Sequence, residues 1–481
     1  MKDTIKYLNY WLKKNSGVLY VLTVLPTILF QVFFTPAFQT PDSFNNFYRS
    51  YQVADGQLIG IKKNGMSGGM INNNMISLAS LFNNIPFHYN KKITQNIIIK
   101  ANTYRWSNGN GKENKYIFSS FSNTSVYPPF AYIPQAAGID IGRIFNLRLI
   151  YTYRLSLILV SLCAIFITFI AIKINSSLTP AIYISASLAM TTCLFAAMET
   201  DALIISSGFL LASLIAKKID GDQKCQYCAL YITLLITFIA LQRPPYIGLV
   251  FLLFIPSFSV SKNYNLMKRI YYSLIPLTAV TTWIIYAKIT AWVNIDPSKG
   301  SLISHILYII RNPFNFLLMI LRTIETNSYT YYHQMIGVLG WLDAPLPHSY
   351  IDITIFVFFI TAFLVIRKIK FYDWLGVSAA LITSLLFFFI SLYADWSPVR
   401  TSIIDGIQGR YFLPLIPLSF VILYPLNNFF RAIVKGYQKN ISKTDVLQYR
   451  SNTLSLFAYL FIYLFFPLLT FFFTINTLLS R

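Results

Sequence analysis

The sequence predicts an all-α membrane protein, a polytopic helical bundle of about 11 transmembrane helices with a long loop after the first. Two observations lead to this prediction. Of the 481 residues, 55% are hydrophobic and only 12% are charged. In addition, several segments reach the roughly 18 apolar residues that a bilayer crossing needs, among them residues 17–34 and 155–172. Because backbone groups in lipid must satisfy their own hydrogen bonds, such segments are expected to be helices.

The first apolar segment is expected to be retained as a membrane span. It is too long for a removed signal peptide, and it lacks a convincing small-residue cleavage site. Ten further apolar segments follow it along the chain. The 11 predicted spans cover residues 17–35, 149–172, 179–197, 201–216, 227–241, 245–259, 270–291, 351–367, 373–393, 411–427 and 455–477.

The formal net charge of +22 is distributed in a way that indicates orientation. Lysines and arginines gather in alternate loops, as in "KKIDGDQK" at 217–224 and in the loop at 428–450. This asymmetry follows the positive-inside rule, and it predicts a cytoplasmic N-terminus and an external C-terminus. Orientation and attraction to anionic membrane lipids then account for most of the basic charge. No nucleic-acid partner is expected.

Two of the predicted external loops are long, at residues 36–148 and 292–350. The first contains Asn- and Gly-rich runs such as "KKNGMSGGMINNNM", which are expected to form a flexible rim. The second contains "RNPFNFLLMILRTIE" at 311–325, whose apolar residues recur at helical spacing. This pattern is typical of a short amphipathic helix in the membrane interface, and a span too short to cross is the alternative. The whole chain, residues 1–481, is expected to form a single polytopic membrane domain.

The charges that orientation does not explain gather at the external ends of the predicted spans. A charged side chain at the centre of a membrane helix costs on the order of 2.5–3.5 kcal/mol, so charges close to hydrocarbon usually mark function. At the interface the cost is smaller, and the clustering on one face is therefore the stronger argument. The residues concerned are Asp42, Glu199, Asp201, Arg243, Asp343, His348, Asp395, Arg400, Asp405 and Arg410.

Acids mixed with arginines at a membrane edge suit a lipid-linked phosphate substrate. Arginine binds phosphate bidentately, and a carboxylate can take a proton from an acceptor hydroxyl. Aromatic residues at the same edge, Tyr127, Tyr132, Trp341, Tyr350 and Trp396, are candidates for stacking on sugar rings. Structural roles remain open for several of these residues: a turn at Asp42, a helix cap at Asp201, snorkelling to headgroups at Arg243, and an interfacial belt for the aromatics.

Six stretches, in order along the chain, carry a family resemblance. They are "TPDSFNNFYRSYQVADGQL" at 40–58, "YPPFAYIPQAAGIDIGRIFNL" at 127–147, "METDALIISSGFLLASLIAKK", "QRPPYIGL", "GVLGWLDAPLP" and "DGIQGRYFLPLIPL". Together they resemble the bacterial multi-pass membrane family catalogued as domain of unknown function 2142, which is grouped with the GT-C glycosyltransferase superfamily. The resemblance covers most of the chain from residue 40 to residue 420.

The resemblance implies a GT-C-like helical core whose first external loop carries a catalytic acid, and polyprenyl-phosphate sugars as donors. By position, Asp42 matches the acid of the family's first motif and is the expected catalytic residue. The expected substrate-binding residues are Glu199, Asp201, Arg243, Asp343, Arg410 and Tyr411. The chain departs from the motif at Ser43, where Glu is usual, and at Asn46, where His is frequent. No metal-binding residue is therefore assigned; no cofactor is certain, and a divalent metal remains open without support from the sequence.

The expected function is that of an inverting glycosyltransferase in the bacterial inner membrane. Its donor would be a sugar linked to undecaprenyl phosphate, and its acceptor a lipid-linked glycan such as O-antigen of lipopolysaccharide, on the periplasmic side. Two alternatives remain. A transporter or flippase of lipid-linked saccharides would place ionisable residues near the middle of its spans. A polysaccharide polymerase would be expected to carry its main external loop late in the chain, whereas here the longest loop is the first.

Overall fold

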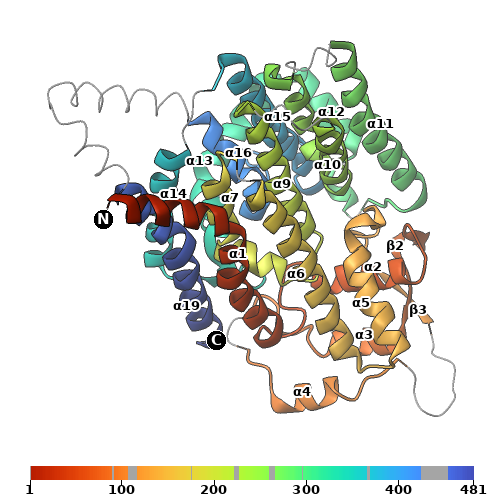
Figure 1. The fold of residues 1–481 in the computed structure, drawn as a ribbon. Coiled ribbons are helices and arrows are strands. Elements are labelled where there is room, and N and C mark those ends of the chain that lie inside the picture. Colours follow the sequence, from red (N-terminus) through yellow and green to blue (C-terminus); the bar gives the residue numbers. More distant parts are fainter. Residues whose placement is uncertain are drawn as a thin grey trace.

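The computed structural model describes residues 2–88, 91–106, 116–174, 176–221, 227–258, 266–294, 296–365, 369–423 and 453–480. Within these ranges the chain forms a helical bundle with a layer of short helices and strands at one end (Figure 1). Seven described helices are long and apolar enough to cross a membrane. They are α1 (Lys2–Phe34), α6 (Leu149–Lys173), α9 (Asp201–Ile219), α11 (Leu266–Thr290), α14 (His348–Val365), α15 (Phe371–Trp396) and a C-terminal helix at Thr453–Leu479. This C-terminal helix includes a π-helical turn at Phe461–Phe465, and its last part is α19 (Phe466–Leu479).

The prediction of a polytopic helical bundle is confirmed, although several predicted spans are shorter or broken. The segment at 179–197 forms two short helices, α7 (Thr179–Ala186) and α8 (Ala189–Phe195), and every residue of both is buried. The segment at 227–241 is α10 (Cys228–Gln242). The segment at 245–259 is an 11-residue 3₁₀-helix, η2 (Pro244–Phe254), followed by η3 (Pro256–Phe258). The segment at 411–427 begins as the 3₁₀-helix η5 (Gly409–Leu415) and continues as α16 (Ile416–Ile422), and residues 424–427 lie outside the described ranges.

The first long loop is ordered where the structure describes it, which corrects the prediction of a flexible rim. It contains α2 (Ser43–Ala54), α3 (Asn73–Ser80), α4 (Gln95–Ala101), η1 (Pro129–Tyr132) and α5 (Ile133–Ile144). It also contains an antiparallel sheet of β1 (Ile61–Lys63), β2 (Met66–Asn72) and β3 (Tyr116–Ser120), in that order. The turn between β1 and β2 is Asn64-Gly65, and both residues have positive φ. Asn-Gly is the preferred sequence for such a hairpin turn, so the Gly-rich segment encodes a hairpin.

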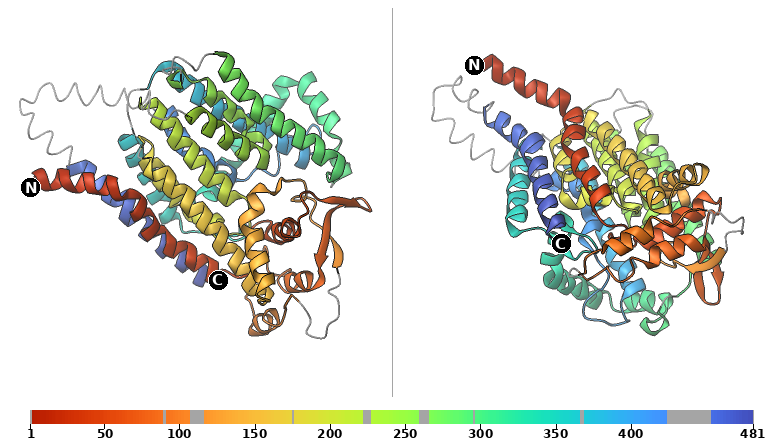
Figure 2. Two further views of the ribbon diagram at one scale, coloured as in Figure 1. Left: turned by 45° about the vertical axis from the view of Figure 1, so that its right-hand side comes forward. Right: turned by 90° about the horizontal axis from the view of Figure 1, so that it is seen from below.

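This layer lies at the end of the bundle that we call the loop end, and Figure 2 shows it from two further sides. Helix α5 packs on α6 through glycines: a Cβ at Gly138 or Gly142 would collide with Ser156 or Thr152 of α6. The other side of the layer is tied to α11, where Trp283 Nε1 donates to the Val126 carbonyl at 2.9 Å. The layer is therefore held against the bundle by both close packing and hydrogen bonds.

Arg49 of α2 holds the inner turns of this layer together, and its side chain is fully buried. Its guanidinium donates to the carbonyls of Leu58 and Tyr127 at 2.6 and 2.9 Å, and to Gln52 Oε1 at 2.6 Å. Burial lowers the pKa of Arg49 to about 10. Carbonyl oxygens thus fix the position of α2, which begins directly after Asp42.

The second long loop contains η4 (Pro297–Lys299), α12 (Leu302–Arg311) and α13 (Pro313–Gly337), followed by the strand pair β4 (Val338–Leu339) and β5 (Ala344–Pro345). The amphipathic stretch predicted at 311–325 begins at the last residue of α12, Arg311, and its remainder from Pro313 forms the first half of α13, which continues to Gly337. Helices α12 and α13 meet at an angle of 104°, and as a bent pair they would raise the count of candidate spans in the described ranges to eight.

Candidate active site

Five of the charged side chains that the sequence placed at one membrane edge meet at the loop end. We call them the carboxylate–arginine cluster: Asp42, Glu199, Asp201, Arg243 and Arg410. Asp42 precedes α2, Glu199 and Asp201 stand at the start of α9, Arg243 follows α10, and Arg410 lies in η5. The cluster joins residues as far apart as 368 positions in the sequence. These parts of the chain meet only through the fold of the bundle.

Arg410 is the centre of the cluster, and only 2% of its side chain is exposed. Its NH1 donates to Glu199 Oε2 at 2.6 Å, and its NH2 donates to Asp42 Oδ2 at 3.1 Å. Its Nε donates to Gln408 Oε1 at 2.7 Å. All three nitrogens of this guanidinium are therefore already used within the protein.

Arg243 makes a narrower set of contacts. Its Nε and NH2 both donate to Asp201 Oδ1, at 3.0 and 2.6 Å, and 19% of its side chain is exposed. Its NH1 has no hydrogen-bond partner among the residues that the structure describes. The guanidinium lies 4.4 Å from the centre of the Tyr411 ring, a cation–π contact that fixes its plane. Arg243 thus keeps a donor group that a ligand could use.

Asp42 is the most exposed member of the cluster, with 39% of its side chain accessible. Its Oδ1 accepts from Asn123 Nδ2 at 2.8 Å, while Oδ2 faces Arg410. The backbone of Asp42 is left-handed, at φ 57° and ψ 8°. This conformation is uncommon for a residue other than glycine, and Asp tolerates it better than most. Its side chain does not cap α2. The carboxylate is instead directed to the donors of two distant segments.

The backbone around Asp42 is stabilised by Asn46, one turn into α2. The Asp42 carbonyl accepts from the backbone N–H and the side-chain amide of Asn46, at 2.9 and 3.1 Å. The Asn46 amide oxygen accepts in turn from the Tyr132 hydroxyl at 2.9 Å. At the position where the resembling family often has His, this chain therefore carries a positioning amide.

Burial raises the pKa of Glu199 well above its ordinary value; Arg410 lowers it, and the nearby Asp201 and Asp42 add to the increase. The cluster has three carboxylates and two guanidinium groups, so one bound proton makes it neutral. Glu199 Oε1 and Asp201 Oδ2 are both buried and accept no N–H from the described residues. A proton on Glu199, hydrogen-bonded to Asp201, satisfies both oxygens.

The chain places these side chains by close backbone approaches. Gly409 brings η5 against α13: a Cβ there would collide with the Tyr331 carbonyl and with Met335. Its N–H donates to Gln334 Oε1 at 2.9 Å. On the next residue but one, the Tyr411 carbonyl accepts from the Tyr246 hydroxyl at 2.7 Å. These contacts fix the backbone on either side of Arg410.

Of the seven residues predicted for the site, Asp343 lies in a turn of the second long loop. Its Oδ1 accepts from the Trp341 N–H at 3.0 Å in the turn between β4 and β5. Glu199, Asp201, Arg410 and Tyr411 do lie in the cluster, but they are buried. Their role in binding substrate, like the roles of the partly exposed Asp42 and Arg243, stays a prediction.

The predicted sugar-stacking aromatics mostly serve other purposes. Tyr132 and Tyr350 are fully buried, and the Tyr350 hydroxyl accepts from the Ala189 N–H at 3.0 Å. Trp341 donates to the Phe38 carbonyl at 2.9 Å. Trp396 is half exposed and has Lys299 above its ring. Tyr127 and Tyr132 both lie close enough to Asp42 and Arg243 to be affected by their charges. Burial raises the pKa of Tyr127 to about 12, and Arg243 opposes the increase. Burial raises the pKa of Tyr132 as well.

Sequence reasoning missed the neutral partners of the cluster, Asn123 and Gln408. Neither forms a recognisable spacing with its charged partner, because Asn123 lies 81 residues from Asp42 in the chain. Gln408 stands two residues before Arg410, and its amide oxygen faces the guanidinium. A search for polar side chains within the six family-like stretches would have found Gln408, whereas Asn123 lies outside them.

Comparisons with known proteins give a likeness among solved structures and a match to a protein family. Among solved structures, the chain is similar to ArnT from Cupriavidus metallidurans, solved with undecaprenyl phosphate bound: the identity is 10%, the match covers 96% of this chain and 77% of that chain, and the TM-score is 0.41. No curated protein matches the chain. The family described as "Predicted membrane protein (DUF2142)" matches residues 13–419. Since this match spans most of the sequence, the chain belongs to the DUF2142 family of membrane proteins.

Proposed function

We propose that this protein is an inverting glycosyltransferase that takes a sugar from undecaprenyl phosphate and adds it to a lipid-linked glycan, such as O-antigen, at the periplasmic face of the bacterial inner membrane. One observation carries the proposal. Asp42 is a partly exposed carboxylate just beyond the end of a membrane-length helix, and Arg410 and Asn123 hold it from two sides. The resemblance to the GT-C superfamily, whose first external loop carries a catalytic acid, agrees with that placement.

In the proposed reaction, Asp42 acts as the general base. It accepts the proton of an acceptor hydroxyl while the oxygen of that hydroxyl attacks the anomeric carbon of the donor sugar. The bond between that carbon and the phosphate oxygen breaks, and undecaprenyl phosphate leaves with the bonding electrons. Attack from the face opposite the leaving phosphate inverts the anomeric configuration. A general base of this kind contributes about 10²–10⁴-fold to the rate.

The two arginines receive different roles in the proposal. Arg243 keeps NH1 without a partner among the described residues, so we assign it to the phosphate of the donor and of the leaving group. Arg410 has donors to Glu199, Asp42 and Gln408, and its burial keeps it from the substrate. Its role is to orient the Asp42 carboxylate. The sequence favoured phosphate binding by both arginines, whereas this proposal gives phosphate binding to Arg243 and the orientation of Asp42 to Arg410.

A transporter or flippase has less support. Such proteins bind their substrate near the middle of the membrane, in a site formed by broken helices. In the cluster, by contrast, the charged residues stand at element ends: Asp42 before α2, Asp201 at the first residue of α9, and Arg243 directly after α10. A site at helix ends suits a headgroup reaction better than passage through the bundle.

The test compares two acids at the two ends of α2. The Asp42→Asn variant removes the proposed base and keeps the shape of the side chain. The matched control, Asp55→Asn, removes a partly exposed acid that pairs with Arg143 at 3.6 Å. Mass spectrometry of the surface glycan is carried out on cells that lack the gene and on cells that express each form.

We expect the unmodified protein and Asp55→Asn to add the mass of one sugar residue to the glycan. Asp42→Asn should reduce transfer by at least about 100-fold, at equal protein level in the membrane. Transfer by Asp42→Asn at the level of the control would remove the base assignment. Identical glycan masses with and without the gene would remove the glycosyltransferase proposal itself.

A further inference from the structure

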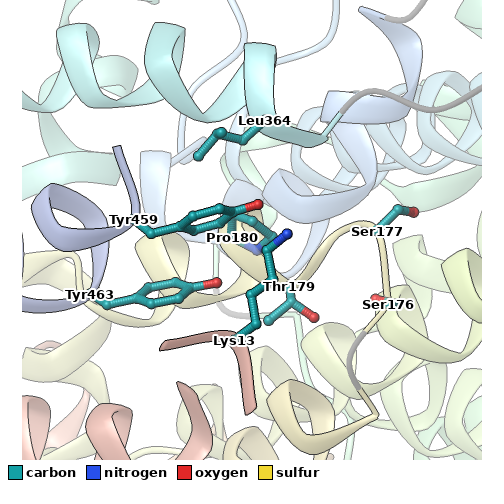
Figure 3. Close-up of a pocket in the computed structure, with 8 residues that line it drawn as sticks. All are labelled: Lys13, Ser176, Ser177, Thr179, Pro180, Leu364, Tyr459 and Tyr463. Atoms are coloured by element: carbon teal, nitrogen blue, oxygen red, sulfur yellow. The ribbon is translucent and has the colours of Figure 1, made fainter. Parts of the chain in front are cut away.

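A polar pocket lies far from the carboxylate–arginine cluster, and its volume is about 180 Å³. It is lined by Lys13 of α1, by the turn at 176–180 between α6 and α7, by Leu364 near the end of α14, and by Tyr459 and Tyr463 of the C-terminal helix (Figure 3). Helix α9 separates the two sites: it starts with Asp201 of the cluster and ends at Ile219, about 28 Å away at 1.5 Å per residue. The next residue, Asp220, accepts from the Ser177 N–H at 2.8 Å.

The pocket contains a hydroxyl that has no hydrogen-bond partner among the described residues. Thr179 is 3% exposed, and its Oγ1 has no hydrogen-bond partner among the residues that the structure describes. A buried hydroxyl without a partner costs about 1–3 kcal/mol, so an occupant that accepts its hydrogen bond would be favoured. This observation is independent of the charge of the pocket.

Lys13 supplies the positive charge. Figure 3 shows its side chain extending past Tyr463 toward Pro180 and Tyr459. Its ammonium lies 4.8 Å from the centre of the Tyr459 ring, and no carboxylate lies within 4.0 Å of it among the described residues. The pocket therefore combines an ammonium without a counter-ion and a buried hydroxyl without a partner.

The backbone adds to the preference for an anion. Helix α7 begins at Thr179, and the start of a helix carries a partial positive charge. The acid that faces this region, Asp220, already accepts the Ser177 N–H. Three lysines lie in the last turns of α6 and α9: Lys173 belongs to α6, and Lys217 and Lys218 belong to α9. Among the described residues of this region the lysines outnumber the acid, Asp220, and its carboxylate already accepts a hydrogen bond.

Two of the helices that line the pocket also carry exposed apolar side chains. Phe359 and Phe363 of α14 and Phe457 and Phe465 of the C-terminal helix all have exposed side chains. An acyl chain can lie along such a surface, while a free anion gains nothing from it. From this combination we propose that the pocket binds the phosphate group of an anionic membrane phospholipid, with the lipid tails against the outer faces of α14 and the C-terminal helix. This site is separate from the proposed glycosyltransferase site and does not depend on it.

The proposal is tested by native mass spectrometry of the purified full-length protein in detergent, titrated with phosphatidylglycerol. Diacylglycerol with the same acyl chains is the probe without phosphate, and inorganic phosphate is the probe without tails. Two variants alter the pocket: Lys13→Gln removes the charge, and Thr179→Val removes the hydroxyl while keeping the shape. The matched control is Lys14→Gln, because Lys14 is the neighbouring lysine of α1 and its ammonium lies over Tyr10 instead.

We expect Lys13→Gln to weaken phosphatidylglycerol binding about fivefold or more, and Thr179→Val to weaken it to a smaller extent, whereas Lys14→Gln should change it less than about twofold. Diacylglycerol should not bind measurably. Equal weakening by Lys13→Gln and Lys14→Gln would overturn the site in favour of diffuse attraction to the surface. Binding of inorganic phosphate that displaces the lipid and depends on Lys13 would overturn the lipid source and assign the pocket to a soluble phosphate.

Discussion

Glu199 makes the stability of the cluster depend on pH. Burial raises the pKa of Glu199 above the ordinary 4.5, so the folded protein binds a proton that the unfolded chain releases. The proton on Glu199 stabilises the folded protein fully below about pH 4.5. This stabilisation is lost as the pH rises through the folded-state pKa of Glu199, by up to about 1.4 kcal/mol for each pH unit. We therefore expect Glu199→Gln, which mimics the protonated acid, to remove this decline. Thermal unfolding in detergent between pH 5 and pH 8 measures this decline of stability with rising pH.

The control for this experiment is Asp55→Asn, which removes an acid outside the cluster. The charged groups that face Glu199 are Arg410, Asp201, Asp42 and Arg243, and all are retained in both variants. For each variant, the slope of stability against pH is measured. The difference between the slopes of Glu199→Gln and Asp55→Asn thus reports on Glu199 alone. Parallel pH profiles for Glu199→Gln and the unmodified protein would show that Glu199 is ionised in the folded state.

Which charged residues belong to the site was largely predictable from the sequence, and what each of them does was not. Asp42, Glu199, Asp201, Arg243 and Arg410 were all identified from their places at the ends of apolar segments. Arg243 and Arg410 were indistinguishable there, since each is an arginine beside a short apolar run. Their roles separate only because Arg410 meets two acids from distant segments, and one sequence contains no signal for such pairings.

The 3₁₀-helix η5 carries Arg410, and we expect its close contact with α13 to be required for the geometry of the cluster. In Gly409→Ala, the new Cβ would collide with backbone atoms of Tyr331 and Met335, which cannot move independently of their helix. The expected loss is about 1–3 kcal/mol in the free energy of unfolding, together with reduced transfer activity from a displaced Arg410. Thermal unfolding and the glycan assay are the measurements.

A second glycine provides the matched control. In Gly376→Ala, on α15, the new Cβ would meet the Cγ2 methyl of Ile255, a side-chain atom that can move by rotation about χ1, whereas the nearest atoms opposite Gly409 belong to the backbone. Alanine also favours the helix over glycine by up to about 1 kcal/mol. We expect this variant to retain both stability and activity. If Gly409→Ala behaved in the same way, the close approach of η5 and α13 would not be what positions Arg410.

The segments that sequence analysis read incorrectly share a physical cause. Hydropathy measures the preference of a segment for an apolar environment, which lipid and a protein core supply equally well. The segments at 179–197 and 245–259 are apolar enough to cross a membrane, yet they form short helices or a 3₁₀-helix packed within the bundle. Prolines such as Pro180, Pro244 and Pro245 begin these helices, and they were the available signal that the segments were not continuous α-helices.

At the level of the bundle, the sequence predicted both the helical class and the assembly of charges at one end. The Asn64-Gly65 hairpin in the first long loop was overlooked, because the composition of that loop resembles that of a disordered linker. The prediction that remains to be tested is the orientation of the bundle. The proposed chemistry requires it, because a reaction with undecaprenyl-phosphate sugars on the periplasmic side needs Asp42 on that side of the membrane.

Orientation can be measured with single cysteines in a variant whose four native cysteines are replaced by alanine. Lys6→Cys lies near the start of α1, and Lys92→Cys lies in the loop that follows that helix; both side chains are exposed. The excess of lysine and arginine in alternate loops predicts that the start of α1 lies in the cytoplasm. A membrane-impermeant maleimide applied to cells with a permeabilised outer membrane should therefore label Lys92→Cys and should reach Lys6→Cys only after the inner membrane is opened. The reverse pattern would place Asp42 and the rest of the carboxylate–arginine cluster on the cytoplasmic side. The pocket that contains Lys13 would then face the outer leaflet, and the proposed transfer to a periplasmic glycan would have no site.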